Sequence, residues 1–148
     1  MKSKRVRGYN AERDLVRKLW GLGFAAIRGP ASGAKVKRSV YPDVVAIRNG
    51  LVLVFEVKYR RKLETIYIPQ HQIAKIVEFA RRAGGIPLIA VRIGELKEWR
   101  VVPIDRLEFA NNMFKISRET LENSPKLYDY VSAMTTRKLT SYKQSYSD

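Results

Sequence analysis

The sequence predicts a single α/β domain whose central, mixed β-sheet of about five strands is flanked by helices. Two segments carry apolar residues at helical spacing, several short runs are rich in Val and Ile, and these segments alternate along the chain. At 148 residues, 45% of them hydrophobic, the chain is long enough to bury one substantial core.

A basic arm at residues 1–8 precedes the first predicted helix, which runs from Tyr9 to Leu22. The apolar residues of this helix recur once per turn, at Leu15, Val16, Leu19 and Leu22. A short strand is predicted from Phe24 to Arg28. Residues 29–39 are rich in Gly, Ser and Lys, so they are predicted to form a mobile loop.

A β-hairpin is predicted from residues 43–48 and 51–58. The dipeptide between them, Asn49-Gly50, is the strongest short hairpin signal, because both positions of a type I′ turn need positive φ. The second strand is apolar on both faces until its end, which is the pattern of a buried central strand.

The second half of the domain begins with a short extended segment, Thr65 to Ile68. A helix follows from Pro69 to Ala83, and its buried stripe is predicted to consist of Ile73, Ile76, Val77 and Ala80. Two further strands are predicted, from Ile86 to Ile93 and from Glu98 to Val102.

Residues 1–110 are therefore predicted to form the functional domain, and residues 111–148 a C-terminal extension. Within the extension, Ile116–Leu121 and Leu127–Val131 could be short helices. The stretch from Thr135 to Asp148 is rich in Ser, Thr, Tyr and Lys and has little to bury, so disorder is predicted there.

The charge is the most informative feature of the composition. Twenty-nine Lys and Arg residues against fourteen Asp and Glu residues give a net charge of +15 and a pI near 10.3. Such an excess attracts polyanions, and nucleic acid is the commonest polyanion in a cell. Cysteine is absent, which excludes disulfides and thiol catalysis. With no long apolar run, a cytoplasmic, nucleoid-associated protein is expected.

Two acidic residues of the predicted hairpin are placed against each other. If Asn49-Gly50 is the turn, Asp43 lies directly across from Glu56, and like charges in that position are destabilising. A divalent cation between the two carboxylates would turn the repulsion into coordination. Lys58 lies on the same strand face as Glu56 and adds a positive group. The alternative is that Glu56 and Lys58 form an ordinary ion pair at a strand end.

A third acidic residue, Glu12, falls inside the apolar stripe of the first helix. A glutamate on that side of the helix can reach the sheet, where its partner would be a metal ion or a basic group. The alternative is that Glu12 only interacts with the helix dipole in the first turn.

These residues match a known pattern. Pro42-Asp43, followed after twelve residues by Glu56-Val57-Lys58, fits the PD-(D/E)XK nuclease motif. Together with residues 8–15, residues 23–28, a Ser-containing loop and residues 78–87, the motif resembles the archaeal Holliday junction resolvases over about residues 5–105. The resemblance implies a restriction-endonuclease-like fold.

The resemblance also implies an activity: a homodimer that binds four-way DNA junctions and nicks two opposed strands, using Mg²⁺, for which Mn²⁺ could substitute. Asp43 and Glu56 would hold the metal, with the Val57 carbonyl as an extra ligand, and Glu12 would complete the acidic site. Lys58 would orient the attacking water and stabilise charge on the phosphate, and Ser32 matches a serine that some members need for cleavage. A replication or recombination protein is a further expected partner.

Basic residues flank this site in sequence and are expected to bind DNA by its shape. They are Arg5, Arg7, Arg13, Arg28, Lys35, Lys37, Arg38, Arg60, Arg61 and Lys62. Phe79 is predicted on the outer side of the second helix, where a large aromatic residue indicates a dimer interface. Gln72 occupies the place of a useful glutamine in some related nucleases.

Two other functions fit parts of the sequence. A repair or restriction-type endonuclease would share the same core and act on another DNA substrate. An architectural DNA-binding protein would need only the basic surface, and it would have no reason to oppose Asp43 and Glu56.

Overall fold

The structure is a computed structural model that describes the backbone of residues 4–30 and 40–146, and the side chains of residues 10–30 and 40–136. Its elements are α1 (Lys4–Gly21), β1 (Ala25–Arg28), β2 (Val44–Arg48), β3 (Leu51–Arg60), β4 (Ile66–Pro69), α2 (Gln70–Ala83), β5 (Ile86–Ile93), β6 (Glu98–Pro103), the 3₁₀ turn η1 (Ile104–Arg106), β7 (Glu108–Ala110), β8 (Met113–Ile116), α3 (Arg118–Asn123) and α4 (Leu127–Tyr146).

The predicted mixed sheet of five strands is confirmed, and its strand order is β1-β2-β3-β5-β6. β3 pairs with β5 in parallel, whereas the other neighbouring strands are antiparallel. The extended segment after β3 is β4, and it joins a second, three-stranded sheet with β8 and β7. The sequence analysis did not predict β7 and β8, because each is short and carries few β-branched residues.

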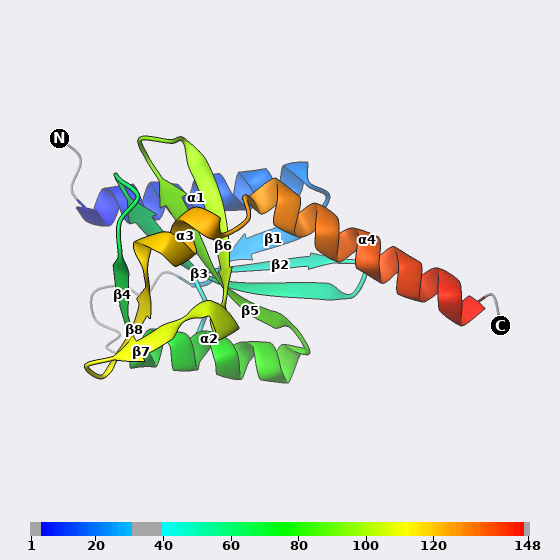
Figure 1. Cartoon of the computed structure of the whole chain (residues 1–148). Coiled ribbons are helices and arrows are strands. Elements are labelled where there is room, and N and C mark those ends of the chain that lie inside the picture. Colours follow the sequence, from blue (N-terminus) through cyan, green and yellow to red (C-terminus); the bar gives the residue numbers. More distant parts are fainter. Residues whose placement is uncertain (1–3, 31–39, 147–148) are drawn as a thin grey trace.

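The five-stranded sheet lies between two helical layers (Figure 1). On one face, α1 and the first turns of α4 pack on the sheet and form the α1-side core, which includes Leu15, Phe55 and Trp99. On the other face, α2, α3 and the small sheet enclose the α2-side core, which includes Ile76 and Ile89. β3 contributes to both cores, because alternate residues of a buried central strand point to opposite faces.

The hairpin between β2 and β3 forms as predicted. Asn49 and Gly50 have φ values of 49° and 78°, as a turn with two left-handed residues requires. Arg48 is paired with Leu51, and the same register continues to Val44 and Phe55. This register brings the start of β2 beside the middle of β3.

The two ends of the chain differ from the prediction. α1 begins at Lys4, so residues 4–8 of the expected basic arm are helical. The backbone from Thr135 to Tyr146 is helical, in the stretch where the sequence predicts disorder. The first turns of α4 pack on the core through Leu127 and Val131. Once a helix has started, each further residue that joins it adds one backbone hydrogen bond, so extending the helix is easier than starting it.

The segment beyond residue 110 is also packed against the rest of the domain. Ile116 and Leu121 lie in the α2-side core, whereas Leu127 and Val131 lie in the α1-side core. Between them the chain passes along the outer edge of β6, where the Val101 N–H donates to the Pro125 carbonyl. Each core therefore contains residues from both sides of residue 110, where the sequence predicts the end of the first domain.

The orientation of α2 corrects one predicted stripe. Ile73, Ile76 and Ala80 are buried as predicted, but Val77 is 40% exposed. Phe79, predicted on the outer side, is half-buried and packs against the α2-side core. The helix is therefore rolled about its axis relative to the prediction.

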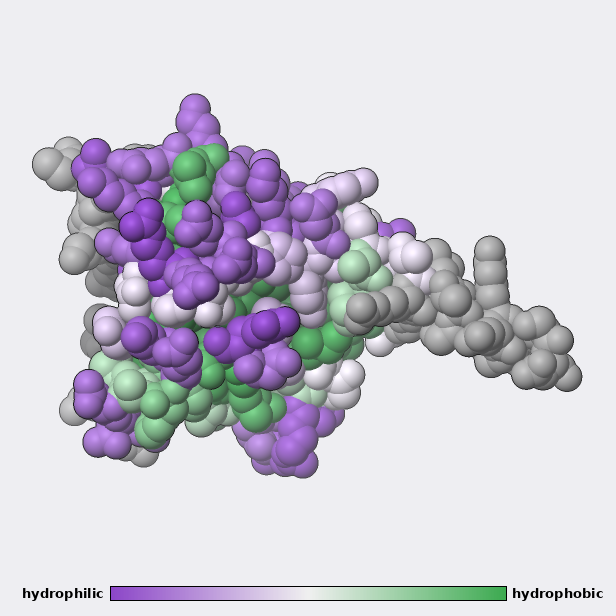
Figure 2. All heavy atoms as spheres, viewed as in Figure 1, coloured by the Kyte–Doolittle hydropathy of each residue, from purple (hydrophilic) through white to green (hydrophobic). Residues whose placement is uncertain are grey.

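The surface divides unevenly by polarity. In the view of Figure 2, polar residues cover the upper part, over α1 and the β5–β6 turn, whereas apolar residues gather lower down, around α2, β7 and β8. Within the part of the chain that is described, no helix is both long and apolar enough to cross a bilayer.

Candidate active site

The candidate active site lies in the second half of β3, beyond the part of the strand that pairs with β2. Glu56 and Lys58 are in the second half of β3, and Asp43 directly precedes β2. α1 brings Glu12 to this region from one face of the sheet, and α2 brings Lys75 from the other. The hairpin register and the two helices thus gather residues that are far apart in the sequence.

The Asp43 carboxylate is held against the backbone that follows Glu56. The Asp43 N–H donates to the Phe55 carbonyl at 3.1 Å, and the Val57 N–H donates to Asp43 Oδ2 at 2.8 Å. The regular pairing of the hairpin ends at Val44, so Asp43 is placed just beyond the strand pair that was expected to include it. Its negative charge still raises the pKa of Glu56.

Glu56 is the most unusual residue of the site, because it is a carboxylate with only 4% exposure. Lys75 Nζ lies 3.4 Å from its Oε2, and Lys58 Nζ lies 3.7 Å from its Oε1. Burial and, secondarily, the charge of Asp43 raise the pKa of Glu56 to about 7, against the opposing effect of the two lysines. Among the residues described, no donor forms a hydrogen bond with Oε2.

Lys58 is held by a second contact. Its ammonium donates to the Gln72 side-chain oxygen, so the amide of α2 fixes the position of a lysine on β3. The lysine side chain is only 18% exposed, which means that few competing water contacts remain. Gln72, which occupies the place of a useful glutamine in some related nucleases, therefore contacts a residue of the site directly.

Lys75 was missed by the sequence analysis, although it carries one of the two cations that face Glu56. One signal was available, because Lys75 follows Gln72 by three residues and so lies on the same side of the helix. Its neighbour Ile76 is fully buried, which places Lys75 at the border of the apolar stripe.

Glu12 has a basic partner, which is one of the two kinds of partner, a metal ion or a basic group, that the sequence predicts for it. Its Oε2 lies 3.3 Å from Nε of Arg28, at the end of β1, and both side chains are largely buried. Burial raises the pKa of Glu12 above its ordinary value; the charge of Asp43 adds to this effect, whereas Arg28 opposes it. The charge of Asp43 therefore acts on both Glu12 and Glu56.

The carboxylates fit a divalent cation by their chemistry. Asp43 and Glu56 raise the local negative charge, and Glu56 Oε2 is a buried oxygen that accepts no hydrogen bond from the described residues. A hard cation such as Mg²⁺ prefers such oxygen ligands. With the side chains as they stand, each carboxylate has a partner of its own, and no three acidic or histidine side chains of the described part converge on one point.

The other predicted site residues are placed as follows. Arg61 and Lys62 are exposed after β3, and the half-buried Arg60 lies 3.8 Å from Glu64. Arg13 is exposed on α1. The predictions for Ser32, Lys35, Lys37 and Arg38, and for the side chains of Arg5 and Arg7, lie outside the described residues.

The chain matches known proteins over nearly its whole length. A family model described as archaeal Holliday junction resolvase (Hjc) matches residues 3–139. A crossover junction endodeoxyribonuclease Hjc from Sulfurisphaera tokodaii is 37% identical over 146 residues, covering 96% of this chain and 99% of the relative. Another from Archaeoglobus fulgidus is 40% identical over 116 residues, covering 78% of this chain and 80% of the relative. The likeness thus extends well beyond the predicted limit near residue 105.

Solved structures support the fold. The structure of Archaeoglobus fulgidus Hjc, a Holliday junction resolvase from an archaeal hyperthermophile, matches with a TM-score of 0.73 and 31% identity, covering 85% of this chain and 96% of that one. A bacterial homing endonuclease matches with a TM-score of 0.56 and 14% identity, over 95% of this chain and 99% of that one, so it shares the fold alone.

The buried carboxylate predicts a pH-dependent stability. Because the pKa of Glu56 rises from 4.5 to about 7 on folding, the folded wild type binds the proton more tightly than the unfolded chain. Its free energy of unfolding should therefore fall as pH rises from about 4.5 to about 7, relative to Glu56→Gln, by at most about 3 kcal/mol. Urea unfolding of both proteins in EDTA across this range measures the difference.

The matched control for this measurement is Lys75→Met. Removing the lysine that lowers the pKa of Glu56 should extend the pH-dependent loss of stability to higher pH. The same substitution made in the Glu56→Gln protein should leave the pH dependence flat. A constant difference between wild type and Glu56→Gln at every pH would contradict the assignment.

Proposed function

Because this chain belongs to the archaeal Holliday junction resolvase family and is therefore an endonuclease, we propose that it binds four-way DNA junctions as a homodimer and nicks two opposed strands by metal-dependent phosphodiester hydrolysis. The observation that supports this most directly is the buried Glu56 beside Asp43, with Lys58 on the same strand. A protein that only binds DNA has no use for a carboxylate in this position.

We infer that Asp43 and Glu56 hold Mg²⁺, with the Val57 carbonyl as an additional ligand. Mn²⁺ would serve in its place, since it prefers similar oxygen ligands. When bound, the ion would activate water and neutralise charge on the phosphate. Without the ion, Lys75 and Lys58 balance the charge of Glu56, because their ammonium groups lie 3.4 Å from Oε2 and 3.7 Å from Oε1.

The chain's own residues have distinct parts in this proposal. Lys58 is a compact cation that can hydrogen-bond to the attacking water or to a phosphate oxygen, and Gln72 fixes its ammonium. Arg28 has a planar guanidinium suited to phosphate, and Glu12 holds it through Nε, which orients the remaining N–H groups. Glu12 would therefore act on the acidic site and on the orientation of Arg28 together.

A homodimer is supported by an apolar sheet face. Ile27 is paired with Val45, and Val45 with Val54, which lies in the α2-side core. These residues share one face, but α2 packs over β3 and β5 and leaves the β1–β2 part uncovered. Ile27 is 67% exposed and Ile47 is 48% exposed there. A second copy of the chain would bury these side chains and supply the second active site that two opposed strands need.

Substituting Asp43→Asn tests the catalytic proposal. We expect cleavage of a four-way junction in Mg²⁺ to fall by more than about 100-fold, the upper end of the loss when only a supporting partner of a metal ligand is removed. Junction affinity in EDTA should remain, since the substitution removes a negative charge near the DNA. Cleavage and gel-shift assays measure the two properties.

Linear duplex and flap substrates serve as controls for this experiment. We expect the wild type to cut the junction and to leave the linear duplex intact. Equal cleavage of all three substrates would contradict junction specificity. Loss of binding together with cleavage in Asp43→Asn would assign Asp43 a structural role.

The apolar face predicts the effect of adding charge there. Ile27→Asp combined with Ile47→Asp should convert the wild-type dimer to a monomer, because two buried carboxylates would be unpaired in each half of the interface. Sedimentation velocity measures the change. Leu96→Asp, at a site that is 48% exposed on the β5–β6 turn, is the matched control and should stay dimeric. A dimer that survives in the double variant would contradict this choice of face.

A further inference from the structure

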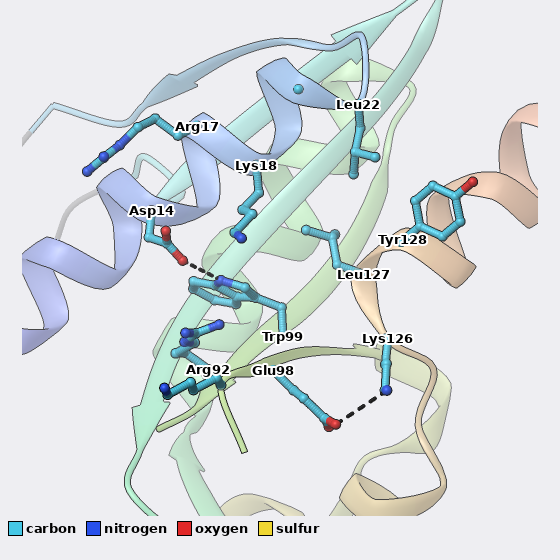
Figure 3. Close-up of a pocket in the computed structure, with 12 residues that line it drawn as sticks. Asp14, Arg17, Lys18, Leu22, Arg92, Glu98, Trp99, Lys126, Leu127 and Tyr128 are labelled. Carbon is cyan, nitrogen blue, oxygen red and sulfur yellow. Dashed lines mark hydrogen bonds and ion pairs between the residues drawn. The ribbon is translucent and has the colours of Figure 1, made fainter. Parts of the chain in front are cut away.

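A groove separate from the candidate active site lies between α1, the β5–β6 turn and the start of α4 (Figure 3). It encloses about 660 Å³, and its apolar wall includes Leu22, Trp99 and Leu127. The Trp99 indole N–H donates to Asp14 Oδ2 at 2.7 Å, which joins the middle of α1 to the edge strand β6. This bond holds the two sides of the groove together.

The charge of the groove is predominantly positive. Arg17, Lys18, Arg92 and Lys97 line it, and none of them forms an ion pair with any residue in the described part of the chain. In Figure 3, the Lys18 and Arg92 side chains approach Trp99 from opposite sides.

The acidic residues of the groove are already engaged. Asp14 accepts the indole hydrogen bond, and Glu98 lies 2.9 Å from Arg100 and 3.4 Å from Lys126. These two cations hold the pKa of Glu98 below its ordinary value, so it remains ionised and paired. The remaining positive charge of the groove is therefore available to an anionic ligand.

The groove is connected to the candidate active site by the backbone. The N–H groups of Gly94 and Glu95, in the β5–β6 turn, donate to the carbonyls of Arg60 and Arg61 at 2.8 and 2.9 Å. Arg61 and Glu95 also form an ion pair at 3.5 Å. Gly94 also packs closely on the hydroxyl end of the Tyr59 side chain, which brings the turn against β3.

Cations lie on both sides of this connection. Arg61 and Lys62 are exposed just after β3, and Lys97, Arg92 and Lys18 line the groove. Lys58 is paired with Val91 and Tyr59 with Arg92, so the Arg92 side chain points to the α1 face of the sheet, whereas that of Lys58 points to the α2 face. The cations of the groove therefore form a second positive surface, which suits the closely spaced phosphates of a duplex.

We propose that this groove binds the phosphate backbone of one arm of the DNA substrate, away from the phosphate that is cut; the inference rests on the proposed function. Phosphate contacts of this kind position the duplex and carry no sequence information. The contact would therefore favour a substrate with an arm that leaves the site in the direction of β6. A short linear duplex centred on the site would not reach the groove.

The test removes two cations from the groove. Arg17→Ala combined with Lys18→Ala keeps good helix formers on the exposed flank of α1. The salt dependence of junction binding, measured by fluorescence anisotropy in EDTA, should lose about two units of slope for each protomer whose groove contacts an arm, roughly one per phosphate contact. Trimming the junction arms should weaken binding by the wild type and change it much less in the variant.

The matched control is Arg106→Ala combined with Arg118→Ala. It removes the same charge from exposed residues on the opposite face of the sheet, where no ion pair with a described residue is lost. This control should retain the wild-type slope. Equal losses in both double variants would overturn the proposal, because net charge alone would then explain them.

Two further outcomes would also overturn it. Unchanged junction affinity in the groove variant would show that the groove does not bind DNA, and a segment of a partner protein would then be the better candidate to bind its apolar wall. Absence of junction binding by the wild type would contradict the proposed function itself, and the inference with it. The first outcome leaves cleavage of junctions by the wild type intact, so the two failures can be told apart.

Discussion

The burial of one carboxylate in the central strand sets the conditions for the whole site. Glu56 is in β3, between two hydrophobic cores, where an isolated negative charge is costly. The structure compensates for it with lysines from two different elements, Lys58 from β3 and Lys75 from α2. The charge of Asp43 opposes this compensation. Any group that binds here must therefore interact with an existing balance of charges.

This balance depends on the packing of the domain. α2 must lie over β3 and β5 for Lys75 and Gln72 to face the strand, and its buried residues Ile73 and Ile76 fix that position. α1 must lie on the opposite face for Glu12 to meet Arg28. A site on a central strand is thus held by both cores together, which favours precise placement of its side chains.

Local sequence signals predicted the strands and helices that carry the site. The Asn49-Gly50 turn determines the register of β2 and β3. The proximity of Asp43 and Glu56 could therefore be predicted from this turn and from the alternation of side chains along each strand. The placement of Lys75 did not follow, because it depends on how α2 is rolled against the sheet. The same uncertainty explains Phe79, which is half-buried although the stripe predicted it outside. Apolar periodicity identifies a helix better than it fixes the rotation of that helix.

The path of the C-terminal segment has a consequence for the behaviour of the protein in a crowded cell. An edge strand offers unpaired backbone groups to strands of other molecules, and this is a common route to aggregation. Here residues 124–126 run along β6: the Arg100 guanidinium donates to the Ser124 carbonyl, and Lys126 forms an isolated bridge with Arg100. The chain therefore shields one border of its own sheet, and a version shortened at residue 110 would present that border to its neighbours.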